Sequence, residues 1–348
     1  MKLAIVGAGA TGGFLGAMLA RAGEDVTLVA RGAHLAAMRV HGVRIISSQA
    51  EIVAFPRCTD DLSAVADADF VLLTVKAHSL PQLAPRIGPL LAPKAAVVSA
   101  QNGLPWWYFS KHGGPLDGTR LRTADPDDTV SDSIDVERVI GCIVYPATRL
   151  VEPGVIEHVE GNRFSIGELD GTRSERCQAL STMLTRAGLK CPVRTRIRHE
   201  LWLKLLGNAV LNPISALTRA TLEDITRDGH TRSVAAAAMR EADSVARAVG
   251  VDLEISVEQR LEGASQVGAH KTSMLQDLES GRPLEVDAVL GAVVEIGDLL
   301  GLDLPHLRTL YACTTLLASV GATGCRNDNR SSTLAAARIG DVGPGNSR

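Results

Sequence analysis

The chain has 348 residues, with 36 lysines and arginines against 39 aspartates and glutamates, and its formal net charge is −3. At about 150 residues per domain, this length predicts two domains, each large enough to bury a core. The near-neutral balance argues against binding to nucleic acid or to a membrane surface, because both need a basic surplus. Aromatic residues make up only 3% of the chain, which disfavours a base-stacking platform. The composition favours an enzyme that acts on a small molecule.

The cysteines and the amino-terminal sequence predict a cytoplasmic protein. The six cysteines include no Cys-x-x-Cys pair and the nine histidines form no metal-binding motif, so we expect neither a disulfide framework nor a metal site. The apolar run Leu3–Val6 is too short for the core of a signal peptide, and no later run is long enough to span a bilayer.

The first half of the chain alternates short apolar runs with helical patterns, which is typical of βα units that build a parallel sheet. We expect strands at Lys2–Val6, Asp25–Ala30, Phe70–Val75 and Ala95–Ala100. Strand-like pieces then follow at Ile140–Tyr145, Gly154–His158 and Arg163–Ile166. We expect these three to extend the same sheet in a mixed or antiparallel manner.

After Pro192 the pattern becomes almost wholly helical. We expect helices at Arg198–Leu211, Arg232–Val249, Val257–Gln266 and Val286–Leu300, with Gly250 and Gly301 as C-terminal caps. The sequence therefore predicts an α/β domain over residues 1–194 and an all-α domain over 195–320. The small, polar and aperiodic segment 321–348 is predicted to be a disordered tail.

A glycine-rich turn directly follows the first expected strand. It reads Gly7-Ala8-Gly9-Ala10-Thr11-Gly12 and opens the expected helix Gly13–Ala22. In such a motif the first glycine permits a tight turn, the second lets the backbone approach a pyrophosphate, and the third lets helix pack close to sheet. We therefore expect a Rossmann-type dinucleotide-binding domain. The alternative is a purely structural glycine turn.

The end of the second expected strand favours NADPH. An NAD site would place an acidic residue there to bind the ribose 2′-hydroxyl, whereas this chain has Arg31 with no acid beside it. A guanidinium can bind a 2′-phosphate bidentately, and such a charge-assisted bond is worth about 1.5–3 kcal/mol. The alternative is a solvated arginine that starts the next helix. Lys76 and Asn102 stand at the ends of two further strands, where we expect them to line the cofactor crevice.

A polar stripe runs along an otherwise apolar helix. Lys204, Asn208 and Asn212 recur at every fourth position and are the only polar residues between Leu201 and Pro213. A stripe that merely faced water would more naturally carry Glu, Lys or Gln, because asparagine is a poor helix former. We therefore expect the two amides to hold a ligand, and Lys204 to become a proton donor if it loses hydration in a cleft.

These residues, in this order, resemble the ketopantoate reductases (2-dehydropantoate 2-reductases). The resemblance covers about residues 1–318, and its motifs are the glycine-rich loop, Arg31, Thr74–Ala77, Asn102-Gly103, Glu200–Leu205, Asn208, Asn212-Pro213, Ser273–Asp277 and Glu285–Asp287. It implies a Rossmann domain and a helical domain that enclose the active site. It also implies that NADPH delivers hydride to the 2-oxo group of a small 2-oxo acid.

The resemblance also implies individual roles. Lys204 would protonate the carbonyl oxygen as hydride arrives, and Glu285 would hold both the product hydroxyl and Lys204. Asn208 and Asn212 would hold the hydroxyl region of the substrate, and Ser273 would bind its carboxylate. Without the resemblance, a helix cap would explain Ser273 and a first-turn partner of the helix dipole would explain Glu285 equally well.

For the cofactor, the resemblance implies that Arg31 binds the 2′-phosphate and that Lys76 and Asn102 lie beside the cofactor and the reacting centre. Asn102 is followed by Trp106–Phe109, where ketopantoate reductases are shorter and more polar. These rings either pack between domains or subunits, or they wall the substrate pocket and favour a bulkier 2-oxo acid.

Three interpretations stay open: a ketopantoate reductase, a reductase of the same fold for another 2-oxo acid, and a non-catalytic NADPH sensor. The intact Lys204 and Glu285 disfavour the sensor, since a sensor has no need of a proton donor. The oligomeric state also stays open, with a homodimer as one candidate.

Overall fold

The computed structural model describes residues 1–320, which form two compact units. The first unit comprises Met1–Leu206, Asp243–Glu254 and Asp287–Leu302. The second comprises, among the described residues, Gly207–Ala242, Ile255–Val286 and 303–320. The segment 321–348, predicted to be a disordered tail, lies outside the described residues.

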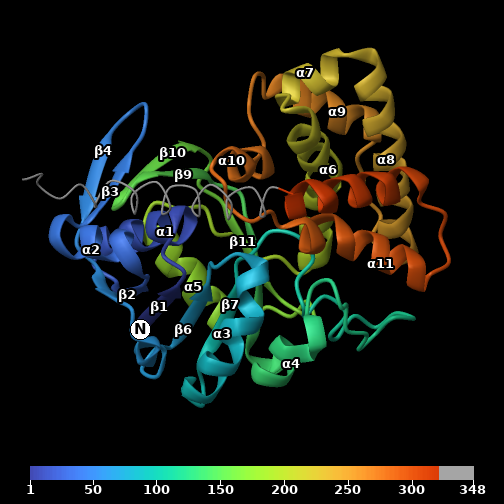
Figure 1. The fold of residues 1–348 in the computed structure, drawn as a ribbon. Coiled ribbons are helices and arrows are strands. Elements are labelled where there is room, and N and C mark those ends of the chain that lie inside the picture. Colours follow the sequence, from blue (N-terminus) through green and yellow to red (C-terminus); the bar gives the residue numbers. More distant parts are fainter. Residues whose placement is uncertain (321–348) are drawn as a thin grey trace, which may run out of the picture. The chain divides into compact units, whose positions relative to one another are not determined.

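A seven-stranded sheet in the order β11-β8-β7-β6-β1-β2-β5 organises the first unit (Figure 1). Its strands are β1 (Lys2–Val6), β2 (Asp25–Val29), β5 (Arg57–Thr59), β6 (Phe70–Leu73), β7 (Ala96–Ser99), β8 (Val139–Val144) and β11 (Phe164–Glu168). Every neighbouring pair is parallel except β11 with β8. The strand order reverses at β1, which pairs with β2 on one side and with β6 on the other. Open α/β sheets bind their ligands beyond the carboxyl ends of the strands at such a point.

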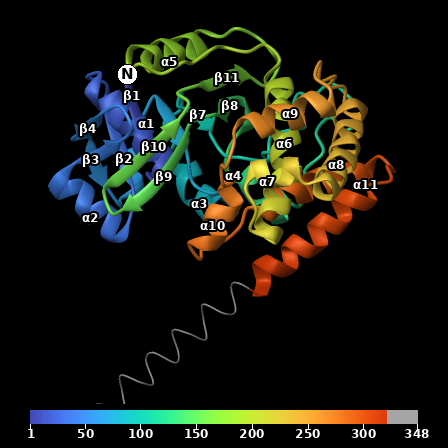
Figure 2. The same cartoon turned by 90° about the horizontal axis from the view of Figure 1, so that it is seen from above.

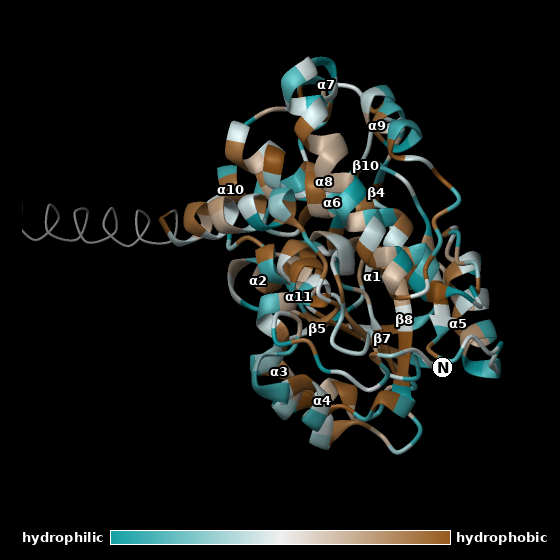
Figure 3. Ribbon diagram, turned by 90° about the vertical axis from the view of Figure 1, so that its right-hand side faces the viewer, coloured by the Kyte–Doolittle hydropathy of each residue, from teal (hydrophilic) through white to brown (hydrophobic). Residues whose placement is uncertain are grey.

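The inner strands are apolar on both faces. Every residue of β6, β7 and β8 is buried, and the region around β7 and β8 is largely hydrophobic in Figure 3. The helices α1 (Ala10–Arg21) and α5 (Glu175–Arg186) share one core with alternate strand residues such as Ile5 and Leu72. Figure 2 shows α5 alongside β11, and Figure 1 shows α3 (Leu80–Ile87) in front of β6 and β7, near α4 (Thr129–Ser133). Cover on both faces explains why these strands are continuous hydrophobic runs.

A second sheet, in the order β4-β3-β10-β9, corrects one prediction. It contains β3 (Val43–Ile46), β4 (Glu51–Ala54), β9 (Ala147–Glu152) and β10 (Val155–Glu160). The expectation that Gly154–His158 extends the parallel sheet is therefore wrong, because this stretch pairs with β3 and β9. Arg163–Ile166 does extend the main sheet, as the antiparallel edge strand β11. The pairing of β10 with β3 joins segments about a hundred residues apart, and helix α1 packs on both sheets.

The second unit is helical. It contains α7 (Leu222–Arg227), α9 (Val257–Gln266), α10 (Ser273–Glu279) and a helix over residues 305–320. Two long helices, α6 (Ile197–Thr218) and α8 (Gly229–Ala248), each contribute residues to both units. The first unit also holds α2 (Gly32–His41), the π-helical turn Asp287–Gly291 and α11 (Ala292–Leu299).

Most predicted helices are confirmed, and one is longer than predicted. Helix α6 continues through Pro213 to Thr218 instead of ending at Leu211, although an interior proline removes one backbone hydrogen bond. Gly250 and Gly301 have φ angles of +80° and +68°, the left-handed conformation of a helix-ending glycine. Within residues 1–320, no helix combines the length and the apolar character that a membrane crossing needs.

Candidate active site

Two of the three loop glycines are required by the fold itself. Gly7 has a φ of +96°, and a Cβ there would lie 2.5 Å from Val75 Cγ1. A Cβ on Gly12 would lie 2.4 Å from Thr74 Oγ1, and this hydroxyl donates to the Gly7 carbonyl over 2.9 Å. The turn after β1 therefore fits tightly against the end of β6.

Gly9 has no such requirement. Its φ is −74°, and the nearest atom to a Cβ built there is 4.0 Å away. A methyl group would enter open space beside the loop, at the N-terminus of α1. This helix has no side-chain cap and no acidic residue in its first turn. A helix N-terminus of this kind attracts an anion, and the open space fits the close approach of a dinucleotide pyrophosphate.

Arg31 stands at the carboxyl end of β2 as the N-cap residue of α2. Its guanidinium is exposed and makes neither a hydrogen bond nor an ion pair with any other residue in the described part of the chain. Helix α2 also lacks a capping side chain and an acidic first turn. The arrangement leaves a guanidinium available to a charged group next to the ribose position of a Rossmann-type site.

His34 supports the glycine-rich loop, and sequence reasoning missed it. The Gly154 N–H donates to His34 Nδ1 over 2.9 Å, so Nε2 carries the proton and donates to the Ala8 carbonyl over 2.7 Å. Burial lowers the pKa of His34, and the hydrogen bond to Ala8 opposes this shift. The neutral ring thus ties the loop to the β9–β10 turn. Its position three residues after Arg31 is the only signal in the sequence.

Lys204 and Asn102 are in direct contact. The Lys204 ammonium donates to Asn102 Oδ1 over 2.6 Å and also to the Val144 carbonyl. Asn102 follows β7 and Val144 ends β8, so both acceptors lie at the carboxyl edge of two adjacent parallel strands. Two carbonyl-type oxygens thus orient a half-buried ammonium group beside this edge.

The loop that carries Asn102 is held by the π-helical turn Asp287–Gly291. Gly103 has a φ of +86°, and a Cβ there would lie 2.3 Å from the Ala288 carbonyl oxygen. The next residue, Leu104, donates its N–H to the same oxygen over 2.7 Å. Ala288 belongs to the π-helical turn, an irregularity that often occurs at functional sites.

The first unit brings several predicted site residues to one edge of its main sheet. Lys76 follows β6 and is half-buried. The glycine-rich loop, Arg31, Lys76 and Asn102 thus stand at the carboxyl ends of β1, β2, β6 and β7, and Lys204 contacts Asn102 there.

The other predicted residues belong to the second unit. Asn208 and Asn212 follow one and two turns after Lys204 on α6; Asn208 is half-buried and Asn212 is buried. Glu285 is half-buried and directly precedes a helical residue. Ser273 is the exposed first residue of α10, and Thr272 caps that helix by accepting from the Leu275 N–H. The alternative that Ser273 is the helix cap is therefore wrong.

The aromatic segment Trp106–Phe109 is buried, each ring being at most 5% exposed. The Tyr108 hydroxyl accepts from Trp202 Nε1, and Arg198 donates to the backbone carbonyls of Tyr108 and Ser110. Trp107 packs over Gly141. These contacts favour packing within the first unit for Trp107 and Tyr108. Burial also raises the pKa of Tyr108, so its hydroxyl stays protonated.

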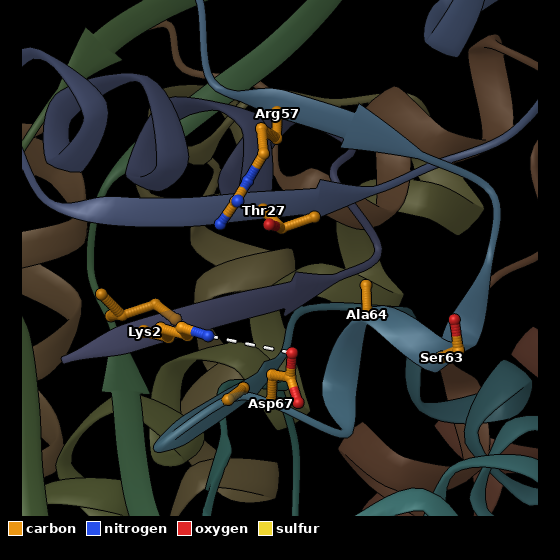
Figure 4. A pocket seen from close by; sticks show the side chains of 8 residues that line it. Lys2, Thr27, Arg57, Ser63, Ala64 and Asp67 are labelled. Carbon is orange, nitrogen blue, oxygen red and sulfur yellow. Dashed lines mark ion pairs between the residues drawn. The ribbon is translucent and has the colours of Figure 1, made fainter.

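A pocket of about 240 Å³ lies at the opposite edge of the main sheet (Figure 4). It is lined by Lys2, Leu3, Thr27, Arg57, Ser63, Ala64, Asp67 and Ala68, most of which stand at or before the amino ends of strands. Its charges are matched, because Lys2 pairs with Asp67 at 3.8 Å and Arg57 pairs with Asp25. We do not assign the candidate site to this edge. Among residues 1–320, no three or more His, Cys, Asp or Glu side chains are grouped to hold a metal ion.

The class of protein follows from two features: the parallel sheet with its glycine-rich loop, and Lys204 at the carboxyl ends of the strands. Both are typical of a dinucleotide-dependent oxidoreductase. The family model "Ketopantoate reductase PanE/ApbA" matches residues 3–107, and that of its C-terminal domain matches residues 196–318. A 2-dehydropantoate 2-reductase of Mesorhizobium japonicum is 48% identical, covering 91% of this chain and 98% of the relative. One of Archaeoglobus fulgidus is 30% identical, with 89% and 95% covered.

Solved structures agree. A candidate ketopantoate reductase from Ralstonia solanacearum superimposes with a TM-score of 0.87 at 39% identity, covering 92% of this chain and 98% of that one. The chain belongs to the ketopantoate reductase family, as the resemblance implies. It is an oxidoreductase of a pyridine-nucleotide-dependent family.

Proposed function

We propose that this chain reduces 2-dehydropantoate (ketopantoate) to pantoate with NADPH, a step of pantothenate biosynthesis. The observation that carries the proposal is the contact of Lys204 with Asn102 and the Val144 carbonyl at the carboxyl edge of the sheet. The 48% identical relative that bears this enzyme name supports the choice of substrate.

Lys204 is the proposed proton donor. Bound NADPH supplies the hydride, and negative charge develops on the 2-oxo oxygen of the substrate. An ammonium group at that oxygen stabilises this charge and delivers the proton. Asn102 and the Val144 carbonyl hold the ammonium, so little reorientation is needed when the substrate arrives.

The remaining roles follow the family resemblance. Asn208 and Asn212 hold the hydroxyl region of the substrate, Ser273 binds the carboxylate, and Glu285 holds the product hydroxyl and Lys204. We assign cofactor binding to the domain of residues 1–194 and substrate binding mainly to residues 195–320.

The preference for NADPH over NADH rests on Arg31. An exposed guanidinium that pairs with no other residue of the described part of the chain can form a bidentate contact with the 2′-phosphate, which NADH lacks. The glycine-rich loop receives the pyrophosphate, and Lys76 lies beside the cofactor. We also propose a cytoplasmic location, where thiols stay reduced; all five cysteines in the described residues are unpaired.

The test is an assay of NADPH oxidation with a panel of 2-oxo acids that includes ketopantoate, with NADH as the control cofactor. We expect the highest kcat/KM for ketopantoate with NADPH. A higher value for a bulkier acid would favour the second interpretation. Tight NADPH binding without turnover of any acid would favour the sensor.

A further inference from the structure

A buried carboxylate lies one helical turn before the proposed proton donor on α6. Glu200 is 7% exposed, and its Oε1 accepts hydrogen bonds from the Tyr145 hydroxyl and the Ser165 hydroxyl, both at 2.9 Å. Two guanidinium groups form ion pairs with it, Arg163 at 3.5 Å and Arg194 at 3.3 Å. These four partners come from three segments of the chain: the end of β8, the start of β11 and the segment before α6. A buried carboxylate held in this way is costly to assemble, which points to a role beyond packing.

Tyr145 connects this carboxylate to Lys204. It directly follows Val144, whose carbonyl accepts a hydrogen bond from Lys204. The Lys204 Nζ also lies 6.0 Å from the centre of the Tyr145 ring, and Arg163 stacks on that ring at 3.8 Å. Glu200 therefore fixes the hydroxyl end of a side chain whose neighbouring backbone holds the ammonium group.

The charges around Lys204 depend on Glu200. Burial and the hydrogen bond to Glu200 raise the pKa of Tyr145 to about 12, so its hydroxyl remains a donor. Cys142 on β8 also interacts with Lys204, and burial raises the pKa of its thiol, which stays neutral. The carboxylate of Glu200 is thus the negative charge that counters the two guanidinium groups. Without it, Arg163, which stacks on the same Tyr145 ring that Lys204 approaches, would lose a counter-charge and would repel the ammonium more strongly.

We propose that Glu200 is a positioning residue for Lys204, an inference that rests on the proposed function. Through Tyr145 it fixes the end of β8, and with it the Val144 carbonyl that holds the ammonium. Its charge also balances Arg163 and Arg194, which keeps Lys204 protonated until the substrate oxygen takes the proton.

The first experiment compares Glu200→Gln with Glu168→Gln. Glu168 is a matched control, because it is also buried and accepts from Arg176 and Ser174, yet it ends the antiparallel strand β11 at the opposite edge of the sheet. We expect Glu200→Gln to lower kcat about tenfold and to move the alkaline limb of kcat/KM to lower pH by about one unit. Glu168→Gln should change neither quantity, even if it lowers the Tm.

Tyr145→Phe separates positioning from charge. It keeps the ring that Arg163 stacks on and both ion pairs of Glu200, and it removes the hydroxyl with its hydrogen bonds to Glu200 and Arg163. We expect a several-fold lower kcat, an unchanged KM for NADPH and an unchanged alkaline limb. This variant also tests the inference if Glu200→Gln does not fold.

A measurement without turnover separates failure of the inference from failure of the proposed function. Acetylation of Lys204 by acetic anhydride, followed by peptide mass spectrometry across a pH series, reports the fraction of unprotonated amine. We expect its midpoint to move to lower pH in Glu200→Gln and to stay in place in Glu168→Gln. If the parent protein does not reduce ketopantoate but the acetylation midpoint moves in Glu200→Gln, the proposed function fails and the positioning role stands. If the protein turns over normally, and both Glu200→Gln and Tyr145→Phe match Glu168→Gln in kcat, pH profile and acetylation, the inference is overturned.

Discussion

The Trp202 indole donates its N–H to the Tyr108 hydroxyl over 2.6 Å, and both side chains are fully buried. Trp202 lies two residues before Lys204 on α6, and Tyr108 lies six residues after Asn102. This bond therefore ties the helix that carries the proposed proton donor to the segment that carries its acceptor. The aromatic stretch is part of the support of the site as well as of the core.

The aromatic segment gives a prediction on stability and selectivity. Trp107→Ala should lower the free energy of unfolding by about 3–5 kcal/mol, the usual cost of truncating a buried large aromatic residue, and should leave the ranking of 2-oxo acids by kcat/KM unchanged. Trp106→Ala is the comparison, because Trp106 is the most exposed of the four rings, at 5% against 1% for Trp107. Urea unfolding and the 2-oxo acid panel measure both effects. A changed ranking in Trp107→Ala would mean that its ring walls the substrate pocket after all.

Removal of the proposed proton donor should abolish most of the activity. Lys204→Ala should lower kcat by about two to four decades, the range for a lost general acid, and leave the affinity for NADPH largely intact. Steady-state kinetics and fluorescence titration with NADPH measure the two quantities. Lys111→Ala is the control, because that lysine pairs with Glu137 at the surface. Retention of more than about a tenth of the activity would exclude Lys204 as the acid.

Arg31 should discriminate between the two cofactors. Arg31→Ala should weaken NADPH binding by about one to two decades and NADH binding far less, because the proposed partner of the guanidinium is the 2′-phosphate, which NADH lacks. The control is Arg39→Ala on the same helix, where the arginine pairs with Asp60. The measurement is the Kd of NADPH and of NADH for the parent protein and for both variants. An equal loss for NADPH and NADH would show that Arg31 supports the loop instead.

The loop glycines should separate binding from folding. Gly9→Ala should keep the Tm of the parent protein and weaken NADPH binding, because its methyl enters open space that we propose the cofactor pyrophosphate occupies. Gly12→Ala should lower the Tm, because its methyl would meet Thr74 and the Gly7 carbonyl. Thermal unfolding with and without NADPH distinguishes the two variants. Unchanged NADPH affinity in Gly9→Ala would argue that the pyrophosphate binds elsewhere.

His34 should make stability depend on pH in a defined window. Its pKa is lowered in the folded chain, mainly by burial, so the unfolded chain binds the extra proton more readily. The contribution of His34 to the free energy of unfolding is therefore fully present above the ordinary histidine pKa of about 6.5 and is lost as the pH falls below that value. Comparison of Tm between pH 8 and pH 5 should show a smaller acid-induced decrease in His34→Gln than in the parent. Parallel curves would assign the acid sensitivity to other groups.

Local patterns predicted the parts of the fold that are stabilised locally. The strands β1, β6 and β7 are short apolar runs next to turn residues, and α9 has the bounds that its pattern predicts. The second sheet could not be predicted in this way, because β3 and β10 pair across about a hundred residues and β4 has only four residues, of which one is buried.

The same distinction applies to the site. The spacing of Lys204, Asn208 and Asn212 is a property of one helix, and it can be seen in the sequence. Their roles stay predictions. The supporting roles of His34 and Glu200 arise from contacts between distant segments. A single histidine or glutamate forms no sequence pattern from which such a role could be predicted.

Helix α1 is clamped from two sides. A Cβ on Gly13 would lie 2.5 Å from Ile156 of the second sheet, and a Cβ on Gly16 would lie 2.3 Å from Leu28 of the main sheet. Each interior glycine costs about 1 kcal/mol of helix propensity relative to alanine, and here it permits close packing on both sides. The N-terminus that we propose for nucleotide binding is therefore ordered before any ligand arrives. Binding then needs little loss of backbone entropy from the protein, so that most of the ordering falls on the flexible dinucleotide itself.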